Sequence, residues 1–281
     1  MRAKKNRPKI PNVVCISDTH IGCKLALMSP AGAVLDEGNT VLPSAFQLRM
    51  WEHWRYFWDE WVPMATHGEP FAVVHNGDAI DGVHHQGTTQ WSQCLADQRT
   101  HAELILGPVV AACEGRYYHI RGTEAHVGKS ATEEEQLAKS LGAVRSRDGH
   151  YARWDLWKTF GDHLLNFSHH IGTTSSAQAE TTALTGELAS AFTEAGQWGH
   201  RPPSVIVRSH RHRQSEIRLP ASWGYATVLV TPAWQGKTPY VHRLKQGRTG
   251  TPQVGGSLIR IGDEELHTRH RVCDLGRSDP E

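Results

Sequence analysis

Residues 13–20 carry the sequence Val-Val-Cys-Ile-Ser-Asp-Thr-His, an apolar run that ends in a carboxylate and an imidazole. Residues 71–81, Phe-Ala-Val-Val-His-Asn-Gly-Asp-Ala-Ile-Asp, repeat this pattern. Short apolar runs of this kind are typical of strands buried on both faces of a sheet. In open α/β sheets, ligands and active sites collect beyond the carboxyl ends of the strands. We therefore predict an α/β protein with a functional site at that edge.

Three further polar clusters follow predicted strands at residues 117–121, 163–168 and 204–208. Carboxylate and imidazole groups are ligands that suit Mn, Fe, Zn, Ni or Co. The chain therefore has several candidate metal ligands, each placed where a strand ends. The three clusters are Gly122-Thr123-Glu124-Ala125-His126, His169-His170 and Ser209-His210-Arg211-His212.

The spacing within the clusters is suited to ions that share a ligand. Asp18 and His20 are two residues apart, so both can reach one ion. Asp78 follows a glycine, which allows a sharp turn, and its two carboxylate oxygens can bridge two cations. His210 and His212 are again two residues apart. Two divalent ions about 3.5–4 Å apart hold a hydroxide at neutral pH and neutralise a phosphoryl group during in-line attack.

The clusters resemble the motifs of the calcineurin-like metallophosphoesterases, which are DxH, GDxxD, GNH, a lone His after a strand, and GHxH. The resemblance covers residues 13–212, with Ser209 in place of the usual Gly of the last motif. It implies a four-layer α/β/β/α sandwich of two mixed sheets flanked by helices. It also implies hydrolysis of a phosphate monoester or diester by a hydroxide that bridges two divalent ions, with manganese favoured.

The resemblance also implies roles for individual side chains. Asp78 would bridge the two ions, and Asp81 would order the surrounding loop. His169 is favoured over His170, which could face substrate or solvent. The first ion would be held by Asp18, His20 and His212, and the second by Asp78, His169 and His210.

The third cluster differs from the family motif, because Gly122-Thr123-Glu124 stands where Gly-Asn-His is expected. Thr123 could offer a weak hydroxyl ligand, or Glu124 could supply a charged oxygen to the second ion. His126 could then act as the general acid for the leaving group, or Glu124 could assist that step.

Composition supports one domain, which we place at residues 11–272, with a disordered basic tail at 1–10 and a second tail at 273–281. The 281 residues carry a net charge of +1, which argues neither for nor against a polyanionic partner. No stretch approaches the ~20 apolar residues of a membrane helix. Five cysteines without a CxxC pair fit a reducing compartment. We therefore expect a cytoplasmic protein.

Several other elements are predicted from periodicity and turn signals. Ser44 is expected to cap a tryptophan-rich helix over 44–61, and Pro108 to follow a helix over 90–106. Thr132 to Glu135 resembles a capping box. Gly161-Asp162 is expected to form the turn of a hairpin between strands near 152–158 and 163–168. A weaker helix is expected over 177–196, and closing strands at 225–231 and 256–262.

Two alternatives to a small-molecule phosphoesterase remain open. A DNA or RNA nuclease of the same superfamily fits the basic tail and the arginines around 201–213, and nucleic acid or a nucleotide would then be the partner. A metal-binding pseudoenzyme that recognises a phosphorylated ligand fits the altered third cluster. Arg121, Arg208, Arg211 and Arg213 could grip phosphate or be surface charge.

Overall fold

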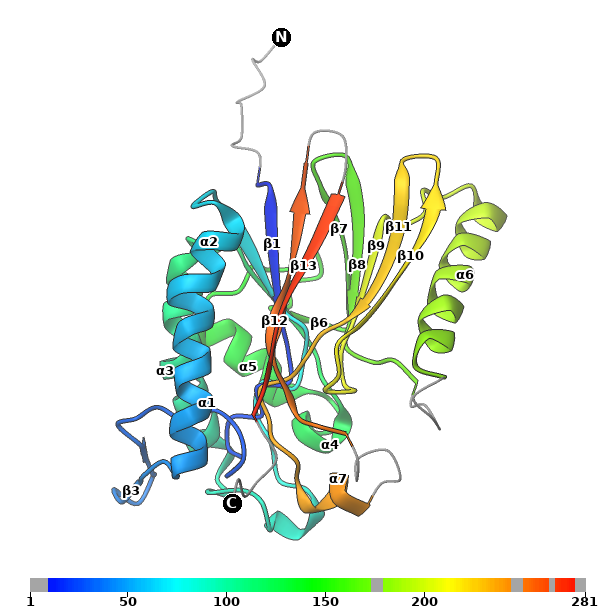
Figure 1. Ribbon diagram of the computed structural model, residues 1–281. Helices are drawn as coiled ribbons and strands as arrows, with labels where there is room; N and C mark the ends of the chain where they lie inside the picture. The colour runs from blue at the N-terminus through cyan, green and yellow to red at the C-terminus, as the bar shows by residue number, and fades with distance from the viewer. Residues whose placement is uncertain (1–9, 173–178, 244–249, 263–265, 276–281) are drawn as a thin grey trace.

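A computed structural model of the protein describes residues 10–172, 179–243, 250–262 and 266–275. Two sheets face each other, with helices on both outer sides (Figure 1). The first sheet has the spatial order β13 (Leu266–Asp274), β12 (Gln253–Ile261), β1 (Asn12–Ile16), β4 (Phe71–His75), β5 (Tyr117–Ile120) and β6 (Ala152–Arg153). The second has the order β10 (Ser215–Ala221), β11 (Gly224–Val230), β9 (Val205–Arg208), β8 (His163–Ser168) and β7 (Asp155–Phe160).

Both sheets are mixed. In the first, β1, β4, β5 and β6 run parallel, and β12 and β13 are antiparallel additions at one edge. In the second, β8, β9 and β11 run parallel between two antiparallel edge strands. The carboxyl ends of the parallel strands therefore meet along one edge of each sheet, and this brings the polar clusters together.

The helices complete four layers, as the sequence predicted. The outer face of the first sheet is covered by α1 (Ala45–Tyr56), the π-helical turn η1 (Phe57–Trp61), α2 (Val62–Thr66), α3 (Leu95–Ala112) and α5 (Thr132–Ser140). The outer face of the second sheet is covered by α6 (Glu180–Trp198). Shorter elements are β2 (Ala33–Val34), β3 (Thr40–Val41), η2 (His85–Gly87), α4 (Glu124–Val127) and α7 (Pro239–Arg243).

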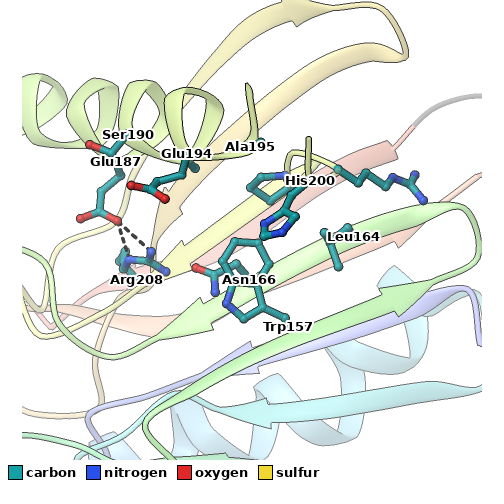
Figure 2. A pocket seen from close by; sticks show the side chains of 12 residues that line it. Trp157, Leu164, Asn166, Glu187, Ser190, Glu194, Ala195, His200 and Arg208 are labelled. Atoms are coloured by element: carbon teal, nitrogen blue, oxygen red, sulfur yellow. Dashed lines mark hydrogen bonds and ion pairs between the residues drawn. The ribbon is translucent and has the colours of Figure 1, made fainter. Parts of the chain in front are cut away.

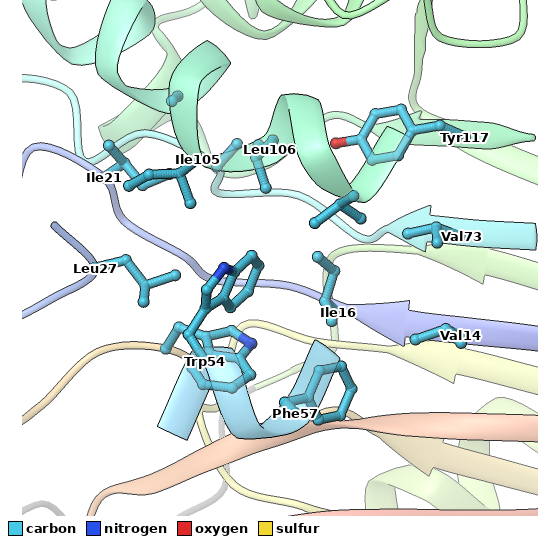
Figure 3. Packing of buried hydrophobic residues seen from close by; sticks show 14 of the residues in the cluster. Val14, Ile16, Ile21, Leu27, Trp54, Phe57, Val73, Ile105, Leu106 and Tyr117 are labelled. Carbon is cyan, nitrogen blue, oxygen red and sulfur yellow. The ribbon is translucent and has the colours of Figure 1, made fainter. Parts of the chain in front are cut away.

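Strand β1 shows why these layers form. Val14 and Ile16 point to the helices, whereas Val13 and Cys15 point to the second sheet, and all four are fully buried. Both faces of the strand are thus covered, which explains its unbroken apolar run. Trp54 and the neighbouring aromatic side chains pack on the helical side (Figure 3). The tryptophan stripe of the first long helix is therefore part of the core.

Three predictions about local structure were wrong. Pro108 lies inside α3, which begins at Leu95 and continues because Ile105, Leu106 and Val109 pack on the first sheet around the proline. Thr132 is the first residue of α5 and not its cap, since Ala131 precedes it in a left-handed conformation. The strand expected near 152–158 is divided, because the chain leaves the first sheet after β6 and enters the second at β7.

Other elements lie close to their predicted places. Ser44 caps α1 through a capping box with Gln47. The hairpin of β7 and β8 turns at Gly161 and Asp162, and α6 occupies most of the helix expected over 177–196. Strands β10 and β13 were not predicted. The proposed tails fall largely on residues 1–9 and 276–281, which lie outside the described residues. In the part of the chain described, no helix has the length and apolar character needed to cross a membrane.

Candidate metal centre

The loops after β1 and β4 are joined by backbone hydrogen bonds. The Asp18 amide donates to the Gly77 carbonyl (2.9 Å), and the His20 amide donates to the Asp78 carbonyl (3.1 Å). Because β1 and β4 are parallel neighbours, their loops leave the sheet side by side. Asp18 and Asp78 are thereby held beside each other at the same edge of the sheet. Both side chains are buried, with an exposed fraction of 0%.

The candidate ligands have an unusual backbone conformation. Nine non-glycine residues of the described chain have positive φ, and five of them are candidate ligands. Such conformations cost about 1–3 kcal/mol each and persist where the surrounding structure enforces them, often at functional sites. The surrounding structure, and not the backbone preference of these residues, therefore sets the conformation of the loops. The five residues are Asp18, His20, Asp78, His210 and His212.

The first group of potential ligands is Asp18, His20 and His212, as the sequence predicted. The Nε2 atoms of the two histidines are 3.1 Å apart, and His212 Nε2 is 3.2 Å from Asp18 Oδ1. Ligand atoms about 2.0–2.1 Å from one ion lie about 3.0–3.4 Å from one another. His20 Nε2 is 3.9 Å from Asp18 Oδ1, so two of the three spacings in this group fit a shared cation and the third is wider.

The second group is Asp78, His169 and His210. His169 Nε2 is 3.0 Å from Asp78 Oδ2 and 3.9 Å from Asp18 Oδ1, so the two groups adjoin. His169 is 2% exposed, whereas His170 is exposed and stacks on the His210 ring with centroids 4.7 Å apart. The structure thus brings His169, and not His170, to the carboxylates.

A third group, His20, Asp81 and His126, was not predicted as a metal site. Asp81 Oδ1 is 3.2 Å from His20 Nδ1 and 3.8 Å from His126 Nδ1. The rings of His20 and His126 meet edge to face, with centroids 4.4 Å apart. His20 therefore joins the first group through Nε2 while its Nδ1 faces Asp81.

Hydrogen bonds to backbone carbonyls orient two of the histidines. The His169 Nδ1–H donates to the Asn76 carbonyl, and the His126 Nδ1–H donates to the Asp81 carbonyl, both over 2.7 Å. In each ring this leaves Nε2 as the atom that faces the carboxylates. Fixing one ring nitrogen in this way is how proteins orient histidine ligands. Asn76 was missed from the sequence because the contact uses its backbone.

The charge state of the centre follows from burial and mutual attraction. Burial raises the pKa of Asp78, but His169 and His126 outweigh it and hold that pKa well below its usual range. Burial lowers the pKa of His169, but Asp78 and Asp18 outweigh it and raise the pKa to about 10. For His210 and His126 burial dominates and lowers the pKa to about 4. The metal-free centre thus has two ionised carboxylates, a protonated His169, and neutral imidazoles at His210 and His126.

Metal binding should therefore release a proton from His169. Its pKa of about 10 means that the metal-free side chain is protonated at neutral pH, whereas a ligating imidazole must be neutral. We expect about one proton to leave with metal binding at pH 7, and fewer as the pH rises through 10. Calorimetry of Zn²⁺ binding in buffers of different ionisation enthalpy measures this release. His169→Gln should remove it and His170→Gln should not; equal heats in all buffers would contradict the assignment.

The third cluster positions Asp78. The Thr123 amide donates to Asp78 Oδ1 over 2.7 Å, and the Thr123 hydroxyl lies 2.9 Å from Oδ2. Glu124 is exposed at the start of α4 and is in none of the three groups. His126 is two residues further on, with its Nε2 3.9 Å from Asp78 Oδ2. Of the three candidates in this cluster, Thr123 and His126 therefore reach the centre.

Glu134 is a buried carboxylate that sequence reasoning missed. It reaches from α5 to accept hydrogen bonds from the Ala79 amide (3.0 Å) and the Gly122 amide (2.6 Å). It thereby ties the loop after β4 to the loop after β5. Its place in a run of three glutamates gave no sign of this role, because the contact depends on how α5 packs on the first sheet.

Asp81 supports the centre from behind, and its replacement should weaken metal binding. Its carboxylate faces His20 Nδ1 and His84 Nε2, each at 3.2 Å. Loss of such a supporting carboxylate usually lowers metal affinity about 10–100-fold, and we expect this range for Asp81→Asn. Competition with a chelating dye measures the affinity. Asp97→Asn is the control, because Asp97 is buried but is in none of the groups; equal affinities in both variants would refute the role.

The arginines near the centre are held by other partners. Arg208 pairs with Glu187 on α6 over 2.8 Å, beside a cavity of about 740 Å³ (Figure 2). Arg213 pairs with Glu180 over 3.1 Å, and Arg211 donates to the carbonyls of Gly172 and Glu180. Arg121 pairs with Glu135 over 3.1 Å. None of the candidate ligands lines the cavity of Figure 2, so it is separate from the centre.

The residues present fit divalent ions. Asp18 Oδ1 and His169 Nε2 are buried and make no hydrogen bond within the described structure. A buried polar atom without a hydrogen bond costs about 1–3 kcal/mol, and the short contacts of these two atoms are with other candidate ligands, so they are expected to face a shared ion. The donors are carboxylate oxygens and imidazole nitrogens, which suit Zn, Mn, Fe, Co or Ni.

Comparison with known proteins gives distant similarities. No family model and no curated protein matches the sequence. A predicted phosphoesterase from Streptococcus pneumoniae has 10% identity and a TM-score of 0.35, over 94% of this chain and 98% of its own. Vps29 from Entamoeba histolytica, complexed with zinc, has 12% identity and a TM-score of 0.40, over 94% of this chain and 99% of its own. The sulfate thiohydrolase SoxB from Thermus thermophilus has 11% identity and a TM-score of 0.40, over 97% of this chain and 58% of its own.

The four layers and the meeting of the five sequence clusters agree with what the metallophosphoesterase resemblance implied for the fold. The resemblance seen in the sequence motifs is thus confirmed at the level of the fold. Its histidine and aspartate groups could hold metal ions.

Proposed function

We propose that this protein is a metal-dependent phosphoesterase that uses two divalent ions, with manganese favoured. The observation that carries the proposal is the contact between the two ligand groups. His169 Nε2 lies 3.0 Å from Asp78 and 3.9 Å from Asp18, so one buried imidazole links the carboxylates of both groups. In the proposal Asp78 is shared by both ions.

In the proposed centre Asp18, His20 and His212 hold one ion, and Asp78, His169 and His210 hold the other. Divalent ions bound there supply charge neutralisation and lower the pKa of a water molecule. Thr123 keeps the Asp78 carboxylate in place through its amide and hydroxyl.

His126 is proposed to protonate the leaving oxygen. Its Nδ1 proton is engaged with the Asp81 carbonyl, so the transferred proton would come from Nε2. Burial lowers the pKa of His126 to about 4, and the negative charge of a bound phosphoester would raise it again. Glu124 is exposed, which makes His126 the stronger candidate for this step.

The test is hydrolysis of aryl phosphate esters after removal of metal with EDTA. p-Nitrophenyl phosphate represents the monoesters, and bis-p-nitrophenyl phosphate the diesters. We expect no turnover in EDTA and recovery on addition of Mn²⁺. The relative rates on the two esters show which class the centre prefers.

One observation favours a second candidate, a metal-binding protein without turnover. Thr123 replaces the family Asn, and its hydroxyl is directed to Asp78. Such a protein would recognise a phosphorylated ligand. Stoichiometric binding of Mn²⁺ together with inert esters would favour this candidate over the enzyme.

A further inference from the structure

A second cleft lies at the open edge between the two sheets, where the chain crosses from β6 to β7. Its volume is about 830 Å³, and residues 144–159 form most of its wall. Tyr118 and Arg121, at the end of β5, complete it. The cleft shares Trp157 with the cavity under α6, and none of the candidate metal ligands lines it.

The cleft concentrates positive charge. Five basic side chains line it, against two acidic ones. Glu135 pairs with Arg121, which leaves +2 in this region of a chain whose total is +1. Such a local excess attracts polyanions even when the protein as a whole is nearly neutral. The basic residues are Arg121, Arg145, Arg147, Arg153 and Lys158, and the acidic ones are Asp148 and Asp155.

Aromatic rings alternate with these charges. Trp154 and Trp157 are 58% and 51% exposed, an unusual cost for two large apolar side chains three positions apart. The Arg121 guanidinium lies over the Trp154 ring, 5.1 Å from its centre. Lys158 Nζ lies 5.4 Å from the centre of the Tyr118 ring. Exposed rings beside cations are how proteins bind the bases and phosphates of single-stranded nucleic acid.

The cleft is lined by residues that are close neighbours, along the chain or across a strand pair, of residues at the metal centre. Arg121 directly precedes Gly122 and Thr123, the residues that surround the Asp78 carboxylate. The Arg121 amide donates to the Arg153 carbonyl over 2.7 Å, which fixes β6 beside the end of β5. On the other sheet Asp155 is paired with Ser168, the residue before His169. Both walls of the cleft therefore end one or two residues from the centre.

We propose that this cleft binds single-stranded nucleic acid and places one of its phosphodiesters at the metal centre. The proposal rests on the proposed phosphoesterase function and names its substrate class. Hydrolysis adds water to the phosphorus, breaks one P–O ester bond and leaves a proton on the departing sugar oxygen. A single strand is favoured over a duplex because its bases are free to stack on Trp154 and Trp157.

Binding is tested first without turnover. Fluorescence anisotropy in EDTA follows a labelled single-stranded oligonucleotide of about 15 nucleotides, within the span of a single-strand-binding surface. We expect affinity for the single strand to exceed that for the matched duplex, and to fall as salt rises. Equal or tighter binding of the duplex, or of polyglutamate, would overturn the proposal in favour of simple polyanion attraction.

Two variants and a matched control locate the site. Trp154→Ala should weaken single-strand binding at least about fivefold through lost stacking. Arg147→Glu should weaken it by a similar factor and flatten the salt dependence. Arg269→Glu makes the same charge change on an exposed residue of β13, at the opposite edge of the first sheet, and should have no effect. Equal effects of both charge reversals would place the binding elsewhere.

Activity assays separate this proposal from the phosphoesterase function itself. With Mn²⁺, Trp154→Ala and Arg147→Glu should raise KM for an oligonucleotide and leave hydrolysis of bis-p-nitrophenyl phosphate unchanged. Turnover of the small ester without single-strand binding would overturn the cleft proposal alone. Single-strand binding without turnover of any ester would support the cleft and overturn the enzyme.

Discussion

Asp78→Asn should abolish phosphoester turnover while the fold remains intact. The substitution keeps the shape of the side chain but removes the charge that two ions are proposed to share. The ions supply several kcal/mol of transition-state stabilisation, and each 1.4 kcal/mol is tenfold in rate, so a loss of about 10³-fold is expected. The assay is Mn²⁺-dependent hydrolysis of the preferred aryl ester at saturating metal.

The controls separate chemistry from folding. The far-ultraviolet circular dichroism spectrum of Asp78→Asn should match that of the unaltered protein. Asp162→Asn makes the same chemical change on the exposed turn between β7 and β8 and should retain full activity. A rate for Asp78→Asn within a few-fold of the unaltered protein would show that Asp78 does not bridge the ions.

Gly122→Ala should be nearly as damaging, for a steric reason. A Cβ atom at this position would overlap both the Asp78 carboxylate and the Asp78 backbone nitrogen. The loop cannot retreat easily, because Glu134 and Thr123 hold it on either side. We expect a loss of stability of about 1–3 kcal/mol from overpacking, together with loss of the second ion. Thermal unfolding and metal analysis measure the two effects.

A glycine in open space is the matched control. Gly186 lies on α6, and a Cβ atom added there meets nothing within 4 Å. Gly186→Ala should therefore leave metal content unchanged and stabilise the protein by about 0.5–1 kcal/mol, since alanine is the better helix former. If Gly122→Ala retained two ions and normal stability, the close packing around Asp78 would be incorrect.

The sequence was sufficient for the central strands and for where the candidate ligands lie, because both depend on local pattern. The apolar run before Asp18 is buried on both faces, and the clusters occur where parallel strands end at one edge. The order of the clusters then matched a known family. Periodicity, spacing and the family resemblance together thus predicted most of the side chains that the structure brings together.

Features that depend on tertiary packing were beyond the sequence. Glu134 contributes through hydrogen bonds to two distant backbone amides, and Asn76 through its carbonyl. The exposure of Glu124 follows from how α4 begins, which no spacing predicts. The chain passes from the first sheet to the second at Trp154, so the single strand that was expected becomes two edge strands, β6 and β7. The basic cleft lies where the chain passes between them.

The shared position of Asp78 is tested most directly by anomalous diffraction from crystals loaded with Mn²⁺. Two peaks about 3.5–4 Å apart, one on each side of the Asp78 carboxylate, are predicted. One of them should contact Asp18, His20 and His212, and the other His169 and His210. A single peak, or two peaks that do not both contact Asp78, would contradict the proposed centre.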